Sequence, residues 1–209
     1  MQKTKKGLLI VLSGPSGVGK GVVCRALMER NPQLKLSVSA TTRLKRPCEI
    51  DGLSYFFKSE EEFKRMIVND EFLEYTSVYG SNYYGTPRAY VEEELAAGND
   101  IILEIDVHGA NQVKKACPFA IAIFLAPPSM SALKSRLIGR GTEDSDAVER
   151  RFGEALFELK QAEKYDYIVV NDVLDKAVTA VEHIISAEHM KAFRRLDFVE
   201  ELEGGSKKQ

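Results

Sequence analysis

The sequence predicts an α/β fold in three layers, built around a parallel sheet with helices on both faces. Two observations favour it: short apolar runs of the kind that form strands buried on both faces, and longer helix-like stretches between them. Strands that alternate with helices in this way pair in parallel, because each crossover helix returns the chain to the same end of the sheet. The runs are Leu8–Leu12, Ile101–Ile105, Ala120–Leu125 and Tyr167–Val170.

A glycine-rich loop directly follows the first of these strands. It reads Gly14-Pro15-Ser16-Gly17-Val18-Gly19-Lys20 and leads into a helical stretch, Gly21–Arg30. Strand, loop and helix come in the order of a P-loop, in which backbone N–H groups and the helix N-terminus surround phosphate oxygens. Lys20 adds a full positive charge for the β and γ phosphates. The sequence therefore predicts a P-loop core that binds a phosphorylated nucleotide.

The hydroxyl residue that usually follows the lysine of such a loop is absent. Gly21 and Val22 stand there instead of Ser or Thr, so the loop offers no side-chain ligand for Mg²⁺. Magnesium keeps several waters and often binds mainly through substrate phosphates. We therefore expect Mg²⁺ to be held by phosphates and water, and we assign it no protein ligand.

The stretch between the first two predicted core strands does not continue the alternation of strand and helix. It contains aromatic segments at Tyr55–Phe57 and Phe72–Tyr79. A helix is expected after Ser59, because Glu62 completes a capping box in which each side chain accepts from the other's backbone N–H. We expect an inserted subdomain with its own mixed sheet. The predicted organisation is a core of residues 1–37, 98–130 and 165–200, the subdomain at 38–97, a lid at 131–164, and a disordered tail at 201–209.

The lid segment is rich in arginine, with Arg136, Arg140, Arg150 and Arg151. A break at Gly139-Arg140-Gly141 gives it a point of flexure, as expected for a helical lid that closes over a reaction. The alternative is a charged amphipathic helix whose acidic residues pair with these arginines in solvent.

Composition excludes several classes of protein. Lys and Arg total 29 against 31 for Asp and Glu, a net charge of -2, which gives no general attraction to nucleic acid or anionic membrane. The three cysteines, Cys24, Cys48 and Cys117, are too far apart for a zinc ribbon or a CxxC pair and leave an odd count for a disulfide framework. The longest apolar run, Phe119–Ala126, falls far short of the ~20 residues that cross a bilayer. We expect a soluble cytoplasmic protein.

Further motifs stand in a fixed order after the P-loop: Ser37-Val38-Ser39-Ala40-Thr41-Thr42-Arg43 with Arg46-Pro47, Glu74-Tyr75, Tyr83-Tyr84-Gly85-Thr86, Glu104-Ile105-Asp106-Val107-His108-Gly109, and Arg140-Gly141-Thr142-Glu143. Together with the loop they resemble guanylate kinase over about residues 7–193. The resemblance implies phosphoryl transfer from ATP to GMP with Mg²⁺, in guanine nucleotide metabolism and GMP recycling. It also makes the subdomain at 38–97 a GMP-binding subdomain.

The resemblance and the chemistry of the side chains together suggest a GMP site. Arg43 and Arg46 are three residues apart, and planar guanidinium groups suit the oxygens of a monophosphate. Guanine presents adjacent donors at N1 and N2, which call for carboxylates such as Glu74 and Asp106, whereas adenine has an acceptor at N1. A basic loop in solvent and capping carboxylates are the alternatives. The expected GMP contacts are Ser39, Arg43, Arg46, Tyr55, Glu74, Tyr84, Thr86 and Asp106, with the hydroxyl of Thr86 or Ser39 donating to O6.

The catalytic groups are carried over from the family in the same way. Because phosphoryl transfer needs alignment and positive charge rather than a nucleophilic side chain, we expect Lys20, Arg136, Arg140 and Arg151 to be catalytic. Glu104 stands where the family usually has aspartate, which leaves its contact with Mg²⁺-bound water or Lys20 open. The ATP contacts implied are Gly14, Pro15, Ser16, Gly17, Val18, Gly19, Lys20, Gly21 and Asn171.

Two other functions remain compatible with the sequence. One is an interaction module of the same family that has lost catalysis, which the missing loop hydroxyl favours slightly and the otherwise intact loop disfavours. The other is a kinase for a sugar phosphate or a different nucleotide on the same scaffold. The expected partners are ATP and GMP, without nucleic acid or membrane, and the sequence allows a monomer or a homodimer.

Overall fold

A five-stranded parallel sheet forms the centre of the protein, which is described here by a computed structural model for residues 6–78, 82–138 and 145–205. The strand order is β2-β7-β1-β8-β9, and every pair in it is parallel. The predicted parallel sheet is therefore confirmed, and β2 is a short edge strand that the sequence did not reveal. The strands are β1 (Leu9–Ser13), β2 (Lys35–Leu36), β7 (Ile101–Glu104), β8 (Ile121–Ala126) and β9 (Tyr167–Val170).

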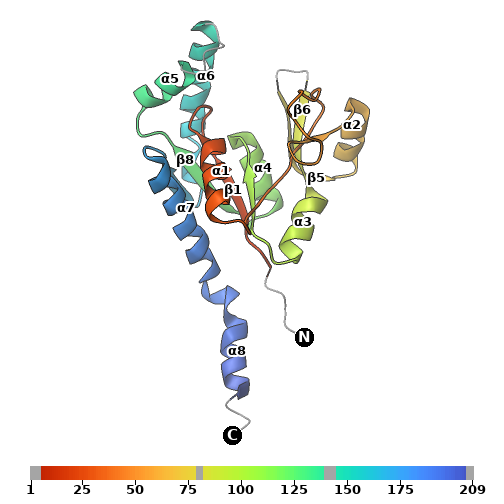
Figure 1. Cartoon of the computed structure of the whole chain (residues 1–209), viewed down its shortest axis with the longest axis vertical. Helices are drawn as coiled ribbons and strands as arrows, with labels where there is room; N and C mark the ends of the chain where they lie inside the picture. Colours follow the sequence, from red (N-terminus) through yellow and green to blue (C-terminus); the bar gives the residue numbers. More distant parts are fainter. Residues whose placement is uncertain (1–5, 79–81, 139–144, 206–209) are drawn as a thin grey trace.

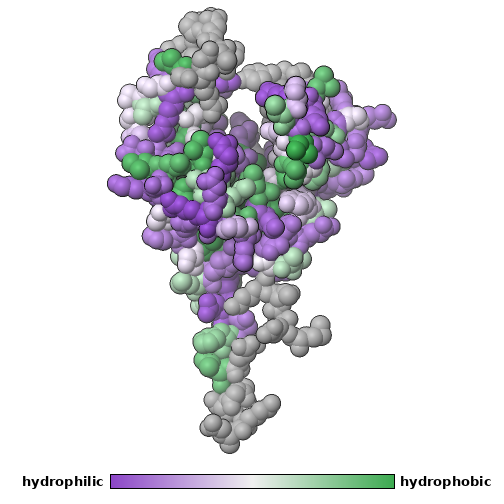
Figure 2. Space-filling view, viewed as in Figure 1, coloured by the Kyte–Doolittle hydropathy of each residue, from purple (hydrophilic) through white to green (hydrophobic). Residues whose placement is uncertain are grey.

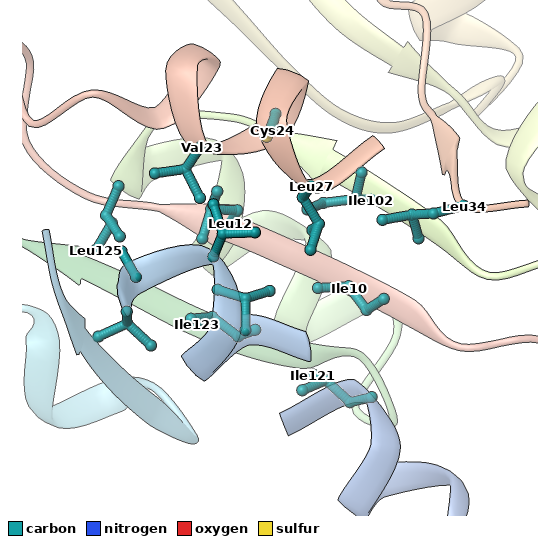
Figure 3. Packing of buried hydrophobic residues seen from close by; sticks show 14 of the residues in the cluster. Ile10, Leu12, Val23, Cys24, Leu27, Leu34, Ile102, Ile121, Ile123 and Leu125 are labelled. Carbon is teal, nitrogen blue, oxygen red and sulfur yellow. The ribbon is translucent and has the colours of Figure 1, made fainter. Parts of the chain in front are cut away.

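Alternate residues of β1 pack against helices on opposite faces of this sheet, because successive side chains of a strand point to opposite sides. Ile10 and Leu12 pack with residues of α1 (Lys20–Arg30) and α7 (Leu174–His189), as Figure 3 shows for part of this cluster. Leu9 and Val11 pack instead with residues of α3 (Arg88–Ala96) and α4 (Val107–Ala116). The result is the three-layer core that the sequence predicts.

The second sheet belongs to the segment between β2 and α3. Its four strands run in the order β4-β3-β6-β5, with β3 parallel to β4 and the other pairs antiparallel, so the mixed sheet is confirmed. A separate small core, centred on Phe63, lies between this sheet and α2. The elements are β3 (Ala40–Thr41), β4 (Phe56–Phe57), α2 (Glu60–Val68), β5 (Phe72–Val78) and β6 (Asn82–Pro87).

Helix α2 begins where the capping signal places it, but only half of the predicted capping box forms. The Ser59 hydroxyl accepts a hydrogen bond from the backbone N–H of Glu62 at 3.0 Å. The Glu62 carboxylate, however, forms an ion pair with Lys58 at 2.7 Å. The prediction that it accepts from the backbone N–H of Ser59 is therefore wrong. A nearby ammonium group offers the carboxylate a charged donor, which is stronger than a neutral amide.

Two arms rise from the parallel sheet on opposite sides (Figure 1). One consists of α2, β5 and β6, and the other of α5 (Met130–Ile138) and α6 (Ser145–Leu159). A small cluster formed by Leu133, Leu137 and Ala155 packs the two helices of the second arm together. A 3₁₀ turn, η1 (Ala162–Lys164), then leads into β9.

The C-terminal part of the chain leaves the body as a further helix (Figure 1). After a 3₁₀ turn, η2 (Ala192–Arg194), α8 spans Leu196–Gly205. This corrects the prediction of disorder from residue 201, while residues 206–209 lie outside the described part. Once a helix is nucleated, each added residue gains a hydrogen bond at little cost, so α8 continues into a sequence that would not start a helix. None of the helices in the described ranges combines the length and apolar character needed to span a membrane.

The small core of the second sheet predicts a local loss of stability when its central ring is removed. Phe63 is fully buried and stacks on Phe72 and Tyr83, with ring centroids 4.4 and 5.5 Å away. We expect Phe63→Ala to cost about 3–5 kcal/mol in the stability of this unit. Hydrogen exchange should then speed up at β5 and β6 and stay slow at β1 and β8.

The control is Val68→Ala on the same helix, because Val68 is 84% exposed. It should change stability by less than about 0.5 kcal/mol. Equal acceleration of exchange in both sheets after Phe63→Ala would contradict the separate core.

Candidate active site

The glycine-rich loop joins β1 to α1 and forms a concave turn at the start of an 11-residue helix. Gly19 caps this helix with φ at 99°, in the left-handed region that favours glycine. Lys20 folds back over the loop and donates from Nζ to the backbone oxygens of Gly14 at 2.6 Å and Pro15 at 3.2 Å. The ammonium group and the helix N-terminus thus place positive charge at the same loop, which suits a phosphate group.

Asn171 and Arg136 support the loop from its other side. Asn171 follows β9, is buried, and donates from Nδ2 to the oxygen of Val18 at 2.8 Å. Arg136 of α5 donates to the oxygens of Asn171 at 2.9 Å and Val18 at 3.3 Å. The structure therefore places Arg136 beside Asn171. The two share a cavity of about 470 Å³ lined by Gly17, Val18, Gly19, Val22, Arg136, Asn171, Asp172 and Leu174.

A second cavity, of about 240 Å³, opens between the mixed sheet and the carboxyl end of β7. It brings together five of the eight residues expected to contact GMP, each from a different segment of the chain: Ser39, Tyr55, Glu74, Tyr84 and Asp106. Its lining also includes Thr76, Glu104 and Ile105, of which Thr76 and Ile105 were not predicted. Ligands of open α/β sheets bind at the carboxyl ends of the strands, and this cavity lies there.

Glu74 is the buried carboxylate of this cavity, with 5% of its surface exposed. Burial raises its pKa to about 7, and the neighbouring charge of Asp106 adds to the shift. The Thr86 hydroxyl donates to Glu74 Oε1 at 2.7 Å, which opposes the shift. Because Thr86 donates its hydroxyl proton to Glu74, Ser39 is the better placed of the two hydroxyl groups expected to donate to a ligand.

Asp106 also has a structural role in this cavity. Its Oδ1 accepts a hydrogen bond from the Gly109 N–H at 2.7 Å and so caps α4. The capping role that the sequence leaves open is therefore present. Because a carboxylate has two oxygens and several lone pairs, capping through Oδ1 is compatible with a second acceptor role toward the cavity.

The two predicted arginines of the loop between β3 and β4 are placed differently. Arg43 lies over the ring of Tyr55, 5.3 Å from its centroid, and pairs with Glu49 at 2.6 Å. Arg46 is exposed and outside the lining of the cavity, and its backbone N–H also donates to Glu49 at 2.9 Å. The prediction missed Glu49, although a carboxylate three residues after Arg46 was the available signal.

A third cavity, of about 640 Å³, lies between the two arms and is lined by groups from both, including Thr76 and Phe157, and by Asp106 of the core. Figure 2 shows the hollow between the arms. Glu158 of α6 also lines it and accepts from the backbone N–H of Ser16 at 3.4 Å. Burial raises the pKa of Glu158 and the charge of Lys20 opposes this shift. The lid helix therefore reaches the phosphate loop.

Glu158 was missed by the sequence reasoning, which weighed other acidic residues of the lid. The available signal was helical spacing, since Glu158 follows Arg151 by two turns on the same face of α6. Arg151 is half-buried on that helix. Arg140 lies outside the described residues.

Comparison with known proteins decides which family has this arrangement. The family model described as guanylate kinase matches residues 6–188. The chain belongs to the guanylate kinase family. A guanylate kinase of Caldanaerobacter subterraneus subsp. tengcongensis is 52% identical over 197 residues, 94% of this chain and 95% of that protein.

Other members of the guanylate kinase family agree in sequence and in structure. The guanylate kinase of Symbiobacterium thermophilum is 52% identical over 93% of this chain and 92% of its own. The crystal structure of guanylate kinase from Anaplasma phagocytophilum superposes with a TM-score of 0.76 at 34% identity, covering 96% of this chain and 95% of that one. The resemblance expected from the sequence motifs is thus confirmed.

The residues around the phosphate loop fit the magnesium ion expected of a guanylate kinase that uses ATP. In the described ranges no group of three or more His, Cys, Asp or Glu side chains is arranged to hold a metal. Glu104 brings a carboxylate close to the start of α1, beside Gly21. One carboxylate suits an ion that keeps phosphate and water as its other ligands.

The surroundings of Glu74 predict opposite shifts of its pKa in two variants. Thr86→Val removes the hydrogen bond that favours the ionised form, so the pKa of Glu74 should rise above about 7. Asp106→Asn removes a neighbouring negative charge and can still cap α4, so the pKa should fall. Carbon-13 NMR of the glutamate carboxyl groups over a pH titration measures both shifts. Two shifts of the same sign would contradict this account.

Proposed function

We propose that this member of the guanylate kinase family transfers the terminal phosphoryl group of ATP to GMP, giving ADP and GDP. The observation that carries the proposal is a pair of acidic groups, the buried Glu74 and the half-buried Asp106, in a cavity beside a P-loop. A carboxylate buried next to another is costly unless a ligand supplies donors to it. The Watson–Crick edge of guanine supplies two adjacent donors, N1–H and the N2 amino group.

ATP is the donor in this proposal, and its phosphates bind the loop from Gly14 to Gly21. The amides of the loop and the N-terminus of α1 accommodate the phosphate charge, and Lys20 exchanges the oxygens of Gly14 and Pro15 for phosphate oxygens. The cavity beside Asn171 and Arg136 takes the nucleoside end. In this placement Arg136 acts at the base end of ATP.

GMP is the acceptor, with its base at Glu74 and Asp106 and its phosphate toward Arg43, Tyr55 and Tyr84. Glu74 binds in its ionised form, because two donors from guanine favour the carboxylate. Ser39 donates to O6. Arg46 extends from the exposed loop next to Arg43 and reaches the phosphate when the arm moves toward the core.

The transfer itself relies on alignment and charge. The two phosphates meet between the arms, next to the phosphate loop that Glu158 of α6 contacts, and Lys20 with the expected catalytic arginines Arg140 and Arg151 supplies the positive charge. These cations balance the charge that develops on the oxygens of the transferred group. Bound Mg²⁺ adds further positive charge on the ATP phosphates. Closure of the lid at 131–164 and of the subdomain at 38–97 over the core excludes water, which would otherwise accept the phosphoryl group.

Substitution of Lys20 tests the proposed donor site. GDP formation from ATP and GMP by Lys20→Ala should be slower by about 10²–10³-fold or more, because one preorganised cation is lost from the transition state. The control is Lys115→Ala, an exposed lysine on α4, which should keep full activity. A coupled assay for ADP release measures both. Undetectable GDP formation by the unmodified protein would favour an interaction module without catalysis.

Substitution of Glu74 tests the choice of acceptor. In Glu74→Gln the side chain presents an amide donor where guanine also donates, so GMP should lose about 10- to 100-fold in kcat/KM relative to AMP. Comparison of GMP, AMP, CMP and UMP measures the change. An equal loss for every acceptor would show that Glu74 does not contact the base. If the unmodified protein prefers a sugar phosphate or another nucleotide to GMP, it is a kinase for that acceptor on the same scaffold.

The raised pKa of Glu74 also predicts a pH dependence of GMP binding. GMP needs the ionised carboxylate, whereas below pH 7 the empty site is mostly protonated. The GMP dissociation constant should therefore rise as the pH falls through 7, with proton release measurable by calorimetry in buffers of different ionisation heat. Glu74→Gln is the control, because it keeps the titration of the GMP phosphate and removes that of residue 74.

A further inference from the structure

Strand β5 presents a hydroxyl group to the cavity proposed to bind GMP, and none of the proposed contacts uses it. Thr76 lines this cavity, and it also lines the larger cavity between the two arms. Asp106 of the core lines both cavities as well. The two cavities therefore adjoin at these two side chains, and a ligand that extends from the first cavity into the second passes Thr76.

The register of β5 and β6 sets the position of Thr76 along the cavity. Because successive side chains of a strand point to opposite faces, Glu74 and Thr76 share a face and lie about 7 Å apart along the strand. Across the ladder, Thr86 is opposite Glu74, and Tyr84 is opposite Thr76. Glu74 belongs to the base end of the proposed GMP site, and Tyr84 belongs to its phosphate end. Thr76 consequently lies between the two ends.

The hydroxyl of Thr76 is available to a ligand, unlike those of the other two threonines in the strands of this sheet. Thr41 donates to the backbone oxygen of Tyr83 at 2.9 Å, and Thr86 donates to Glu74 at 2.7 Å. Among the residues that the structure describes, the half-buried Thr76 has no partner for its hydroxyl. A ligand that fills the cavity takes water away from this group, which is costly unless the ligand offers a hydrogen bond in return.

The part of a nucleotide between its base and its phosphate is the sugar, whose hydroxyl groups both donate and accept hydrogen bonds, as threonine does. The 2′-hydroxyl is on the carbon next to the one that carries the base, so it is the sugar hydroxyl nearer to the base end. We infer that the Thr76 hydroxyl forms a hydrogen bond with the 2′-hydroxyl of the acceptor and so favours GMP over 2′-deoxy-GMP. The inference rests on the proposed binding of GMP in this cavity.

A cycle that removes the hydroxyl of the protein and the hydroxyl of the ligand, singly and together, tests the inference. The unmodified protein should prefer GMP to 2′-deoxy-GMP by about 3- to 10-fold in kcat/KM, the effect of one neutral hydrogen bond. Thr76→Val keeps the branched shape that suits a strand and removes the hydroxyl, so this preference should largely disappear. The loss should come from GMP, while 2′-deoxy-GMP should be used as before. Calorimetry without ATP measures the same ratio in the dissociation constants.

Two further variants and one further ligand serve as controls. Thr76→Ser keeps a hydroxyl at this position and should keep the preference for GMP. Ser77→Ala removes the neighbouring hydroxyl, which the alternation of the strand places on the opposite face of β5, and should leave the preference unchanged. The ligand 3′-deoxy-GMP keeps the 2′-hydroxyl, so Thr76→Val should reduce its use by the same factor as that of GMP.

This inference and the proposed function fail in distinguishable ways. An equal loss for GMP and 2′-deoxy-GMP in Thr76→Val would mean that Thr76 only shapes the strand, and it would overturn the inference. An unchanged ratio, or a coupling with the 3′-hydroxyl instead, would overturn it as well. In each of these cases the protein still binds GMP, and the proposed function stands. If the unmodified protein binds neither GMP nor 2′-deoxy-GMP, the proposed acceptor site is itself wrong.

Discussion

The pairing of β1 with β7 and β8 is the constraint on which the rest of the structure depends. All five residues of β1 are buried, and its two neighbours hold it in parallel along its length. The carboxyl ends of these strands consequently lie at one edge. This edge of the sheet carries the phosphate loop, the carboxylates of Glu104 and Asp106, and Asn171 after β9. Any shift in register would separate the nucleotide loop from the carboxylates that accompany it.

The electrostatics of the site follow from this crowding of strand ends. Glu74, Glu104 and Glu158 all have raised pKa values because the surrounding protein shields their charge from water, most completely at the buried Glu74, and the charge of Lys20 opposes the shift for the last two. Each carboxylate has a different physical partner: a hydroxyl for Glu74, the first turn of α1 for Glu104, and a loop amide for Glu158. An anion that binds the Ser16 amide competes with Glu158 for that donor.

Sequence patterns were most reliable where local physics dominates. The strands of the core were recognised because residues buried on both faces must be apolar, and the start of α2 because Ser59 caps it. Patterns failed where partners are distant in sequence or where an element extends beyond its own signal. Glu62 forms an ion pair with Lys58 instead of the predicted capping bond, and Arg43 forms one with Glu49. Helix α8 continues through residues that by themselves do not favour a helix.

By itself the sequence determined the three-layer parallel core, the phosphate loop and the identity of the residues around it, because these depend on burial periodicity and on motifs a few residues long. Only the tertiary structure decided which of those residues meet. In the structure Arg136 lies beside Asn171, and Arg46 is exposed to solvent. The Thr86 hydroxyl donates a hydrogen bond to Glu74, and Glu104 lies against Gly21. Such contacts join strands and helices far apart in the chain, and their geometry depends on sheet register and side-chain length, which no local pattern records.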